Sequence, residues 1–128
     1  MIGMGRQSRL ATFEEIVMPT GALVVFTTAG SEEQADAIAT SLVEGGLAAC
    51  VNIVSGVRSI YRWKEKVDSD IEHLLVIKTT ADRFEAVRAR IREVHSYELP
   101  EIIALRIENA DSEVLDWIRD SVAPPESD

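Results

Sequence analysis

The feature that most constrains the fold of this chain is a long alternating stretch from Cys50 to Thr79, interrupted once at Lys64-Glu65. Its apolar residues fall mainly at odd positions: Val51, Ile53, Val57, Tyr61 and Trp63 on the first arm, and Val67, Ile71, Leu75 and Ile77 on the second. A period of two is typical of half-buried strands. Two strands of about 14 residues at roughly 3.3 Å per residue would reach roughly 45 Å, whereas a domain of this size measures only about 35 Å across. The sequence therefore predicts a hairpin that protrudes from its own domain.

The far end of this hairpin carries Tyr61 and Trp63, whose large apolar surfaces are costly to leave in water. The second arm is apolar on both faces near its end, because Leu74 and Val76 alternate with the apolar residues Leu75 and Ile77. A strand that is apolar on both faces is covered on both faces. Both observations predict that another copy of the chain packs here, and assemblies of two or three copies satisfy them equally.

The remaining segments predict three helices and two further strands around this hairpin. We expect a buried strand over Ala22–Thr28, a helix opened by a Ser31–Gln34 capping box and stopped at Gly45-Gly46, a helix capped by Thr80, a strand over Glu101–Ile107 and a helix capped by Asp111. The order β-α-β-β-α-β followed by a helix is the split βαβ, ferredoxin-like arrangement of an α+β protein. We expect one such domain over residues 22–122, with tails at 1–21 and 123–128.

Composition excludes several classes of function. The 13 basic and 22 acidic residues give a formal net charge of −9, which disfavours nucleic acid. No apolar run approaches the roughly 18 residues of a membrane helix. The single cysteine, Cys50, forbids an intrachain disulfide and suits a reducing cytoplasm.

Motifs for familiar enzyme chemistry are missing: the sequence has no glycine-rich phosphate loop, nucleophile elbow or zinc spacing. Cys50 lies between Ala49 and Val51, where an apolar setting makes a thiol inert, so we expect it to be a packing residue. His73 alternates with apolar residues and is expected in the core or an interface. Lys78 lies opposite the start of the first arm and points either to solvent or into a cleft.

Two groups of polar residues remain as candidates. Asp68, Asp70 and Glu72 share one strand face, which predicts a solvated surface or, alternatively, a weak site for a divalent cation. The segment from His95 to Glu101 places an imidazole, a phenol and two carboxylates in a helix-to-strand connection. It is either a functional loop or a tight structural connection.

Several motifs, in order and at family spacing, resemble the CutA family of divalent-cation tolerance proteins. They are Leu47-Ala48-Ala49-Cys50-Val51-Asn52-Ile53, Ser59-Ile60-Tyr61-Arg62-Trp63, Ile77-Lys78-Thr79-Thr80, His95-Ser96-Tyr97-Glu98-Leu99-Pro100-Glu101-Ile102-Ile103 and Leu115-Asp116-Trp117-Ile118. The resemblance covers about residues 22–122. It implies a cytoplasmic homotrimer of ferredoxin-like subunits, similar in architecture to the PII signalling proteins and linked to tolerance of copper and other divalent metals.

The same resemblance implies an intersubunit cleft and no catalytic role. Its walls would be Cys50, Tyr61, Trp63, Lys78 and Tyr97, and its metal ligands would be His95, Glu98 and Glu101. No cofactor is obligatory, and Cu(II) or another divalent cation is the expected ligand. Two alternatives stay open: a PII-like signalling module that binds a small metabolite and a protein partner, and an enzyme centred on Cys50 or His95.

The chain departs from the family pattern at three places. Thr27 stands where some copper-binding relatives have a cysteine, and Val94 precedes His95 where those relatives have a second histidine. Ser96 replaces a usual proline. The hairpin turn Lys64-Glu65 lacks the usual glycine, so we expect it to be either wider or strained. The missing cysteine and histidine weaken the expectation of a tight site for a soft metal.

Overall fold

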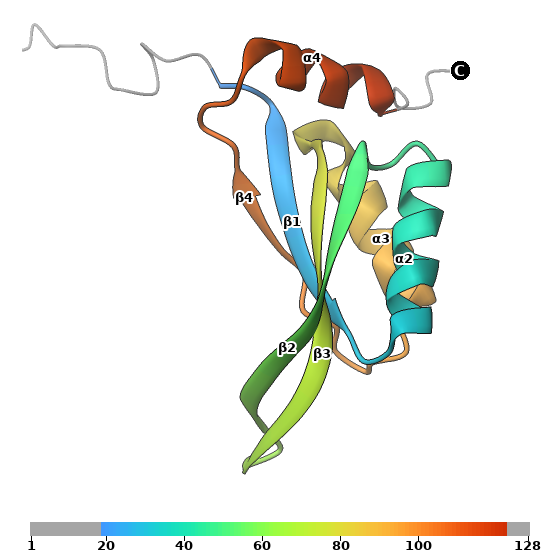
Figure 1. The fold of residues 1–128 in the computed structure, drawn as a ribbon, viewed down its shortest axis with the longest axis vertical. Coiled ribbons are helices and arrows are strands. Elements are labelled where there is room, and N and C mark those ends of the chain that lie inside the picture. Colours follow the sequence, from blue (N-terminus) through green and yellow to red (C-terminus); the bar gives the residue numbers. More distant parts are fainter. Residues whose placement is uncertain (1–18, 123–128) are drawn as a thin grey trace, which may run out of the picture.

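The computed structural model describes residues 19–122 of the 128-residue chain and has the predicted ferredoxin-like α+β fold (Figure 1). In chain order the elements are β1 (Ala22–Ala29), α2 (Glu32–Glu44), β2 (Cys50–Trp63), β3 (Lys66–Thr80), the 3₁₀ turn η1 (Ala81–Arg83), α3 (Phe84–Val94), β4 (Ile103–Arg106) and α4 (Ser112–Ser121). The strands form one antiparallel sheet in the order β2-β3-β1-β4. The predicted tails fall largely outside the described residues. None of the helices within residues 19–122 is long and apolar enough to span a membrane.

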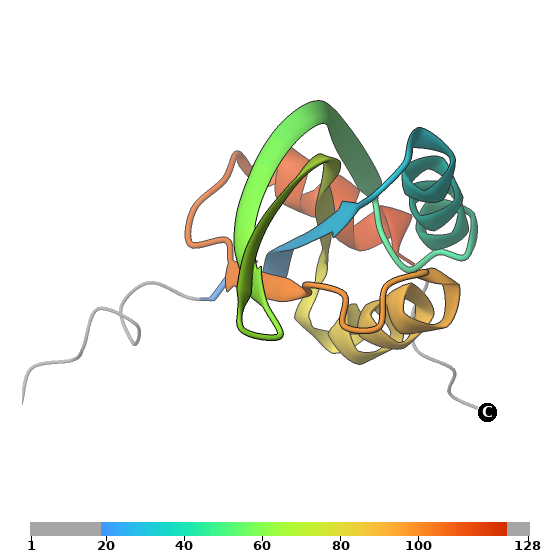
Figure 2. The same cartoon turned by 90° about the horizontal axis from the view of Figure 1, so that it is seen from below.

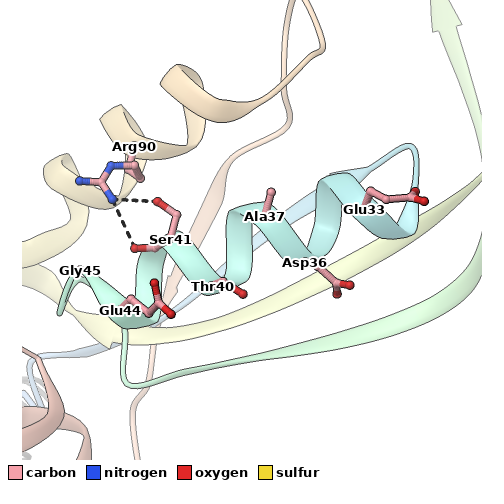
Figure 3. Close-up of a pocket in the computed structure, with 8 residues that line it drawn as sticks. All are labelled: Glu33, Asp36, Ala37, Thr40, Ser41, Glu44, Gly45 and Arg90. Carbon is pink, nitrogen blue, oxygen red and sulfur yellow. Dashed lines mark hydrogen bonds between the residues drawn. The ribbon is translucent and has the colours of Figure 1, made fainter.

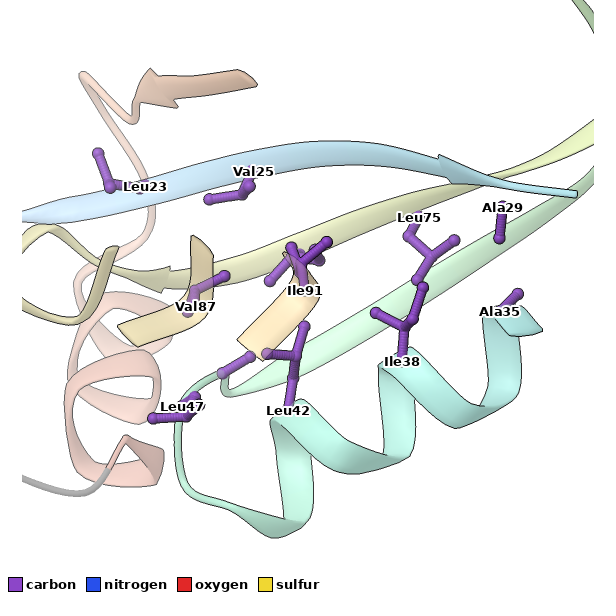
Figure 4. Packing of buried hydrophobic residues seen from close by; sticks show 12 residues of the cluster. Leu23, Val25, Ala29, Ala35, Ile38, Leu42, Leu47, Leu75, Val87 and Ile91 are labelled. Carbon is purple, nitrogen blue, oxygen red and sulfur yellow. The ribbon is translucent and has the colours of Figure 1, made fainter. Parts of the chain in front are cut away.

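One face of the sheet is covered by α2 and α3. The main core lies between this face and the two helices (Figure 4). Alternate residues of β1 and β3 point into this core, because each strand exposes successive side chains to opposite faces. The helices contribute residues three or four positions apart, which lie on the helix faces toward the sheet. The fully buried side chains of the core are Val25, Ala29, Ala35, Ile38, Leu42, Leu75, Ile77, Val87 and Ile91.

The predicted helix caps are partly confirmed. The Ser31 hydroxyl accepts a hydrogen bond from the Gln34 amide at 3.1 Å, and Asp111 caps α4 by accepting from two amides. The capping box was wrong in its second half, because the Gln34 side chain bonds the Val94 carbonyl and the Ser96 amide instead. Thr80 caps no helix directly, since a 3₁₀ turn precedes α3 and the Thr80 hydroxyl donates to Asp82.

The predicted hairpin is confirmed as β2 and β3, and residues 57–63 and 66–72, here called the overhang, extend past the end of β1. Trp63 pairs with Lys66, so the loop holds only two residues. Lys64 and Glu65 both have positive φ, at 51° and 71°. Two-residue hairpin loops with positive φ at both positions favour asparagine and glycine. The turn is therefore narrow and strained rather than wide.

A bulge in β2 changes which way the far half of the strand faces. The register shifts between Val54 and Val57, and Gly56 adopts the left-handed region at φ 78°. Before the bulge, Val51 and Ile53 pack against the core under the helices. After it, Tyr61 pairs with Asp68, and cross-strand partners share a face, so Tyr61 lies on the face opposite the helices. The single alternating face expected from Val51 to Trp63 was therefore wrong, because the extra residue inverts the pattern.

The sheet face opposite α2 and α3, here called the outer face, is covered by α4 at one end only. There α4 buries Ala22 and Ala49 against Ile118 and Val122. The register places further apolar residues on the rest of this face, where they are half-buried or exposed: Val24, Phe26, Val54, Leu74, Val76, Ile103 and Leu105. Figure 2 shows the twisted hairpin with its tip on the side away from α2 and α3.

Candidate functional site

A cleft of about 670 Å³ lies between the overhang and the α3–β4 loop (residues 95–102). Its lining joins the overhang, mainly by its outer face, to the loop that passes the end of β1. The lining residues are Thr28, Ser59, Ile60, Tyr61, Trp63, Asp70, Glu72, Tyr97, Glu98, Leu99 and Glu101. The bulge brings Tyr61 and Trp63 into this set, because without the inversion they would face the other way. Their exposed fractions are 37% and 39%.

Two tyrosine–carboxylate hydrogen bonds connect side chains that line the cleft. The Tyr97 hydroxyl donates to Glu72 at 2.7 Å, and the Tyr61 hydroxyl donates to Asp70. Glu72 is only 7% exposed, so the solvated strand face predicted for the acidic residues of β3 was wrong at this position. The reason is tertiary: the loop carrying Tyr97 closes over Glu72.

Both tyrosines keep their protons well into the alkaline range. The hydrogen bond to Asp70 and the nearby carboxylates raise the pKa of Tyr61 to about 12. Burial raises the pKa of Tyr97, and the hydrogen bond to Glu72 raises it further. A neutral phenol donates a hydrogen bond to a carboxylate, and a phenolate would repel it. At neutral pH both tyrosines are therefore neutral hydrogen-bond donors.

The His95 ring joins the α3–β4 loop to β1 through two hydrogen bonds. The ring Nε2 lies 2.6 Å from the Thr28 carbonyl, which can only accept, so Nε2 carries the proton. Nδ1 then accepts from the Tyr97 amide at 3.1 Å. His95 as a residue is 8% exposed, and its ring packs at a tilt against the Tyr97 ring, with centroids 4.6 Å apart. In this arrangement neither ring nitrogen has a free lone pair for a metal.

The other predicted metal ligands, Glu98 and Glu101, are exposed and line the cleft. Within residues 19–122, no three side chains of His, Cys, Asp or Glu come close enough together to hold a metal ion. The predicted ligand set therefore does not form a site inside one chain. Lys64 at the hairpin tip lies 3.9 Å from Glu98, so the tip and the loop are within ion-pair reach.

Cys50 and Lys78 lie at the other end of the sheet. They are cross-strand partners at the start of β2 and the end of β3, and the Lys78 ammonium donates to Asn52. Lys78 lies six positions after Glu72 along β3, which is roughly 20 Å. Within one chain the predicted cleft residues therefore form two separate groups. Their union in one cleft stays a prediction that requires a second chain.

Sequence reasoning missed three residues that build the cleft. Gly30 lies where an added Cβ would sit 2.8 Å from the Tyr97 hydroxyl, so glycine leaves room for that ring. Gln34 ties the start of α2 to Ser96, and Thr28 accepts from His95. Only Gly30 carries a local signal, as a glycine between a strand and a helix cap. The other contacts join residues more than 60 positions apart.

A second, shallow depression runs along the exposed face of α2 (Figure 3). Arg90 reaches it from α3, but its guanidinium is held by the Ser41 hydroxyl at 2.8 Å and by the Ser41 carbonyl at 3.3 Å. The other lining residues are Glu33, Asp36, Ala37, Thr40, Glu44 and Gly45. This surface is open and its one cation is engaged, so the cleft beside Tyr97 is the better candidate site.

The fold and cleft define a ferredoxin-like α+β protein with a long hairpin and an acidic, aromatic cleft. Residues 23–121 match the profile of the family described as CutA1 divalent ion tolerance protein. This match covers most of the chain, and the chain therefore belongs to the CutA1 family, as its motifs predicted.

Named relatives agree with this assignment. The chain is 50% identical to the divalent-cation tolerance protein CutA of Thermus thermophilus over 77% of its own length and 95% of that protein. The solved Thermus structure superimposes with a TM-score of 0.78 at 48% identity, covering 80% of this chain and 99% of that one. The chloroplastic CutA of Arabidopsis thaliana is 40% identical over 84% of this chain, which spans 59% of that protein. The solved structure of the periplasmic divalent cation tolerance protein CutA from Archaeoglobus fulgidus superimposes with a TM-score of 0.77 at 38% identity. This match covers 80% of this chain and 99% of that one.

Proposed function

We propose that this chain is a homotrimeric, cytoplasmic protein of divalent metal ion tolerance that binds divalent cations, copper among them, weakly at clefts between subunits and catalyses no reaction. The observation that carries the proposal is membership of a family described by divalent ion tolerance. The Thermus and Archaeoglobus relatives carry divalent-cation tolerance in their names.

The cleft supports the cation-binding part of the proposal. Four carboxylates line it, from Asp70, Glu72, Glu98 and Glu101, and none of its described lining residues is basic. Carboxylate oxygens suit hard and borderline divalent cations. Because no preformed three-ligand group exists within residues 19–122, a metal site needs further ligands from water or from a second chain. Binding is therefore expected to be weak.

Uncovered apolar surface supports the assembly. Ile60, Val67 and Ile71 share the face of the overhang that continues the helix-covered face of the sheet, and their exposed fractions are 62%, 65% and 60%. On the outer face, Leu105 and Ile103 are 56% and 48% exposed. Exposed apolar surface of this extent marks interfaces in soluble proteins. A closed ring of three chains would cover both faces and bring the Cys50–Lys78 group of one subunit toward the cleft of another.

Two measurements test the proposal. Sedimentation analysis at micromolar concentration should give the mass of three chains, and a monomer would overturn the assembly. Calorimetric titration with Cu(II) should show saturable binding that weakens in Glu98→Gln/Glu101→Gln. The matched control is Glu108→Gln/Glu113→Gln, which removes the same charge from exposed positions outside the cleft. Equal isotherms for the two double variants would refute the cleft as the cation site.

The same titration tests the predicted role of His95. Its two nitrogens are occupied by Thr28 and Tyr97, so a ligand role requires these contacts to break when metal binds. An unchanged isotherm for His95→Ala would remove His95 from the ligand set. The cytoplasmic location needs fractionation of cells that produce the chain, because relatives named as chloroplastic and periplasmic exist.

A further inference from the structure

We propose that the α3–β4 loop acts as a strap that holds the overhang in a fixed orientation, and that the overhang joins a second copy of the chain in this orientation. The strap requires contacts within one chain only, whereas its role in assembly rests on the trimer of the proposed function. Three features support it: the weak support of the overhang by the sheet, the anchoring of the loop, and the hydrogen bond that connects the two.

The overhang leaves the sheet at a point where it can bend. β1 ends at Ala29, opposite His73, so among the described strands β3 pairs only with β2 beyond this point. A two-stranded ribbon is only marginally stable by itself. The bulge between Val54 and Val57 lies at the same point, and Gly56 has a φ of 78° there. Bulges bend a strand and glycine restricts the backbone least, so this region can serve as a hinge.

The α3–β4 loop is fixed to the part of the chain that lies behind this hinge. The His95 ring donates from Nε2 to the Thr28 carbonyl on β1, across 2.6 Å. The next amide, that of Ser96, donates to the side chain of Gln34 on α2 at 2.8 Å. The loop therefore cannot move away from β1 and α2 without breaking these hydrogen bonds.

The loop is connected to the overhang at the hinge. The Tyr97 hydroxyl donates to Glu72 at 2.7 Å, and Glu72 pairs with Val57, the residue that follows the bulge. Glu72 is only 7% exposed, and breaking a hydrogen bond to a buried acceptor is costly. The ion pair between Lys64 and Glu98 is a weaker connection, because both side chains are more than 70% exposed and exposed ion pairs contribute little. Rotation of the overhang about the hinge is therefore opposed mainly by the Tyr97 hydrogen bond.

A fixed overhang favours association with another chain. When only a fraction of the chains has the orientation that binds, the apparent affinity falls by that fraction. Fixing a segment in its bound orientation beforehand removes part of the entropic cost of association. Loss of the strap should therefore weaken assembly even though the exposed apolar residues Ile60, Val67 and Ile71 remain in place.

Tyr97→Phe tests the strap because it removes the hydroxyl and keeps the ring. The matched control is Tyr61→Phe, which removes the equivalent donor to Asp70, a contact between β2 and β3 inside the overhang. In sedimentation over a dilution series, Tyr97→Phe should dissociate at a concentration about tenfold higher than the parent, and Tyr61→Phe should not. Gly30→Ala, which displaces the Tyr97 ring, is the second variant if Tyr97→Phe does not fold.

The orientation itself can be measured in single chains. Dyes are attached to Glu65→Cys at the hairpin turn and to Asp36→Cys on α2, with Cys50→Ser to remove the native thiol. Single-molecule energy transfer at high dilution then reports the distance between the overhang and α2. We expect one narrow distribution for the parent and for Tyr61→Phe, and a broader one for Tyr97→Phe.

The outcomes separate the strap from the proposed function. A dissociation concentration for Tyr97→Phe equal to that of the parent would overturn the inference. Equal rises in Tyr97→Phe and Tyr61→Phe would also overturn it, because they would point to stiffness of the hairpin itself. A parent that sediments as a single chain at micromolar concentration would contradict the proposed trimer. Energy transfer would then decide on the strap alone, since broadening only in Tyr97→Phe supports it and equal widths refute it.

Discussion

The Tyr97 hydroxyl donates a hydrogen bond to the buried Glu72 carboxylate across 2.7 Å, joining the loop after α3 to the last overhang residue of β3. This contact links two segments that are 25 residues apart and encloses one end of the cleft. It also explains why an acidic residue can be buried on a strand whose neighbours of the same kind are exposed.

Removing this donor should destabilise the fold. Tyr97→Phe leaves Glu72 buried without its described partner, and such a loss costs about 1–3 kcal/mol in the free energy of unfolding. Denaturant unfolding at neutral pH measures the change. The double variant Tyr97→Phe/Glu72→Gln is the control, because a neutral amide is cheaper to bury than an unpaired carboxylate. If Tyr97→Phe were as stable as the parent, the contact would have no energetic role.

Gly30→Ala should disturb the Tyr97–Glu72 hydrogen bond by displacing the Tyr97 ring. The added Cβ would lie 2.8 Å from the Tyr97 hydroxyl, so the ring must shift, at a cost of about 1–3 kcal/mol. The matched background is Tyr97→Phe, which removes the clashing oxygen and leaves ring carbons 3.4 and 3.5 Å away. The substitution should therefore cost much less in that background. Equal costs in both backgrounds, measured by denaturant unfolding, would point to a backbone effect instead.

The tyrosine–carboxylate pairs predict an unusual alkaline titration. Tyr61 and Tyr97 are the only tyrosines of the chain, and both have a raised pKa. The folded protein should show little tyrosinate absorbance at pH 10, where a free tyrosine is about half ionised. Asp70→Asn should lower the pKa of Tyr61 from about 12 toward its ordinary value, because the main cause of the shift is the Asp70 contact.

The sign of the linked stability follows from the direction of these shifts. A raised pKa means that the folded state holds the phenolic proton more tightly than the unfolded chain does. The stabilisation from Tyr61 is therefore fully present below about pH 10 and is lost as the pH rises through about 12. A titration with both tyrosines ionising near pH 10 in folded protein would contradict the two hydrogen bonds.

Thr27→Val should stabilise the protein. The Thr27 hydroxyl is fully buried on the core face of β1 and has no hydrogen-bond partner among the described residues. Replacing it with a methyl group of similar shape removes an unsatisfied polar group, worth about 1–3 kcal/mol. Thr79→Val is the matched control, because the Thr79 hydroxyl is equally buried but donates to the Leu47 carbonyl at 2.6 Å. The midpoint temperature of thermal unfolding should rise for Thr27→Val and fall for Thr79→Val.

Local sequence patterns were sufficient to predict the helices and strands and their order along the chain. Alternation predicted the two long strands, Gly45-Gly46 marked the end of the first helix, and Ser31 and Asp111 marked two helix starts. These signals are local, because an amphipathic period and a cap depend on residues within a turn or two of each other. The excess of hairpin length over domain diameter likewise predicted the overhang.

The face of the far hairpin was decided by tertiary structure. The sequence placed Tyr61 and Trp63 in phase with Val51, but one bulge at Gly56 reversed that phase and turned both rings toward the cleft. A hydrophobic period of two assigns alternate residues to the two faces of a strand. It does not show where a bulge inserts a residue and exchanges the two faces.

The sequence by itself determined the fold class, the protruding hairpin and the family, because these follow from short-range periodicity and from motifs read in order. Only the tertiary structure decided that Glu72 is buried, that His95 supports the loop through both nitrogens, and that Cys50 and Lys78 lie far from Tyr97 within one chain. Burial and hydrogen bonding of these groups depend on neighbours distant in sequence, and those neighbours are fixed by strand register and loop path.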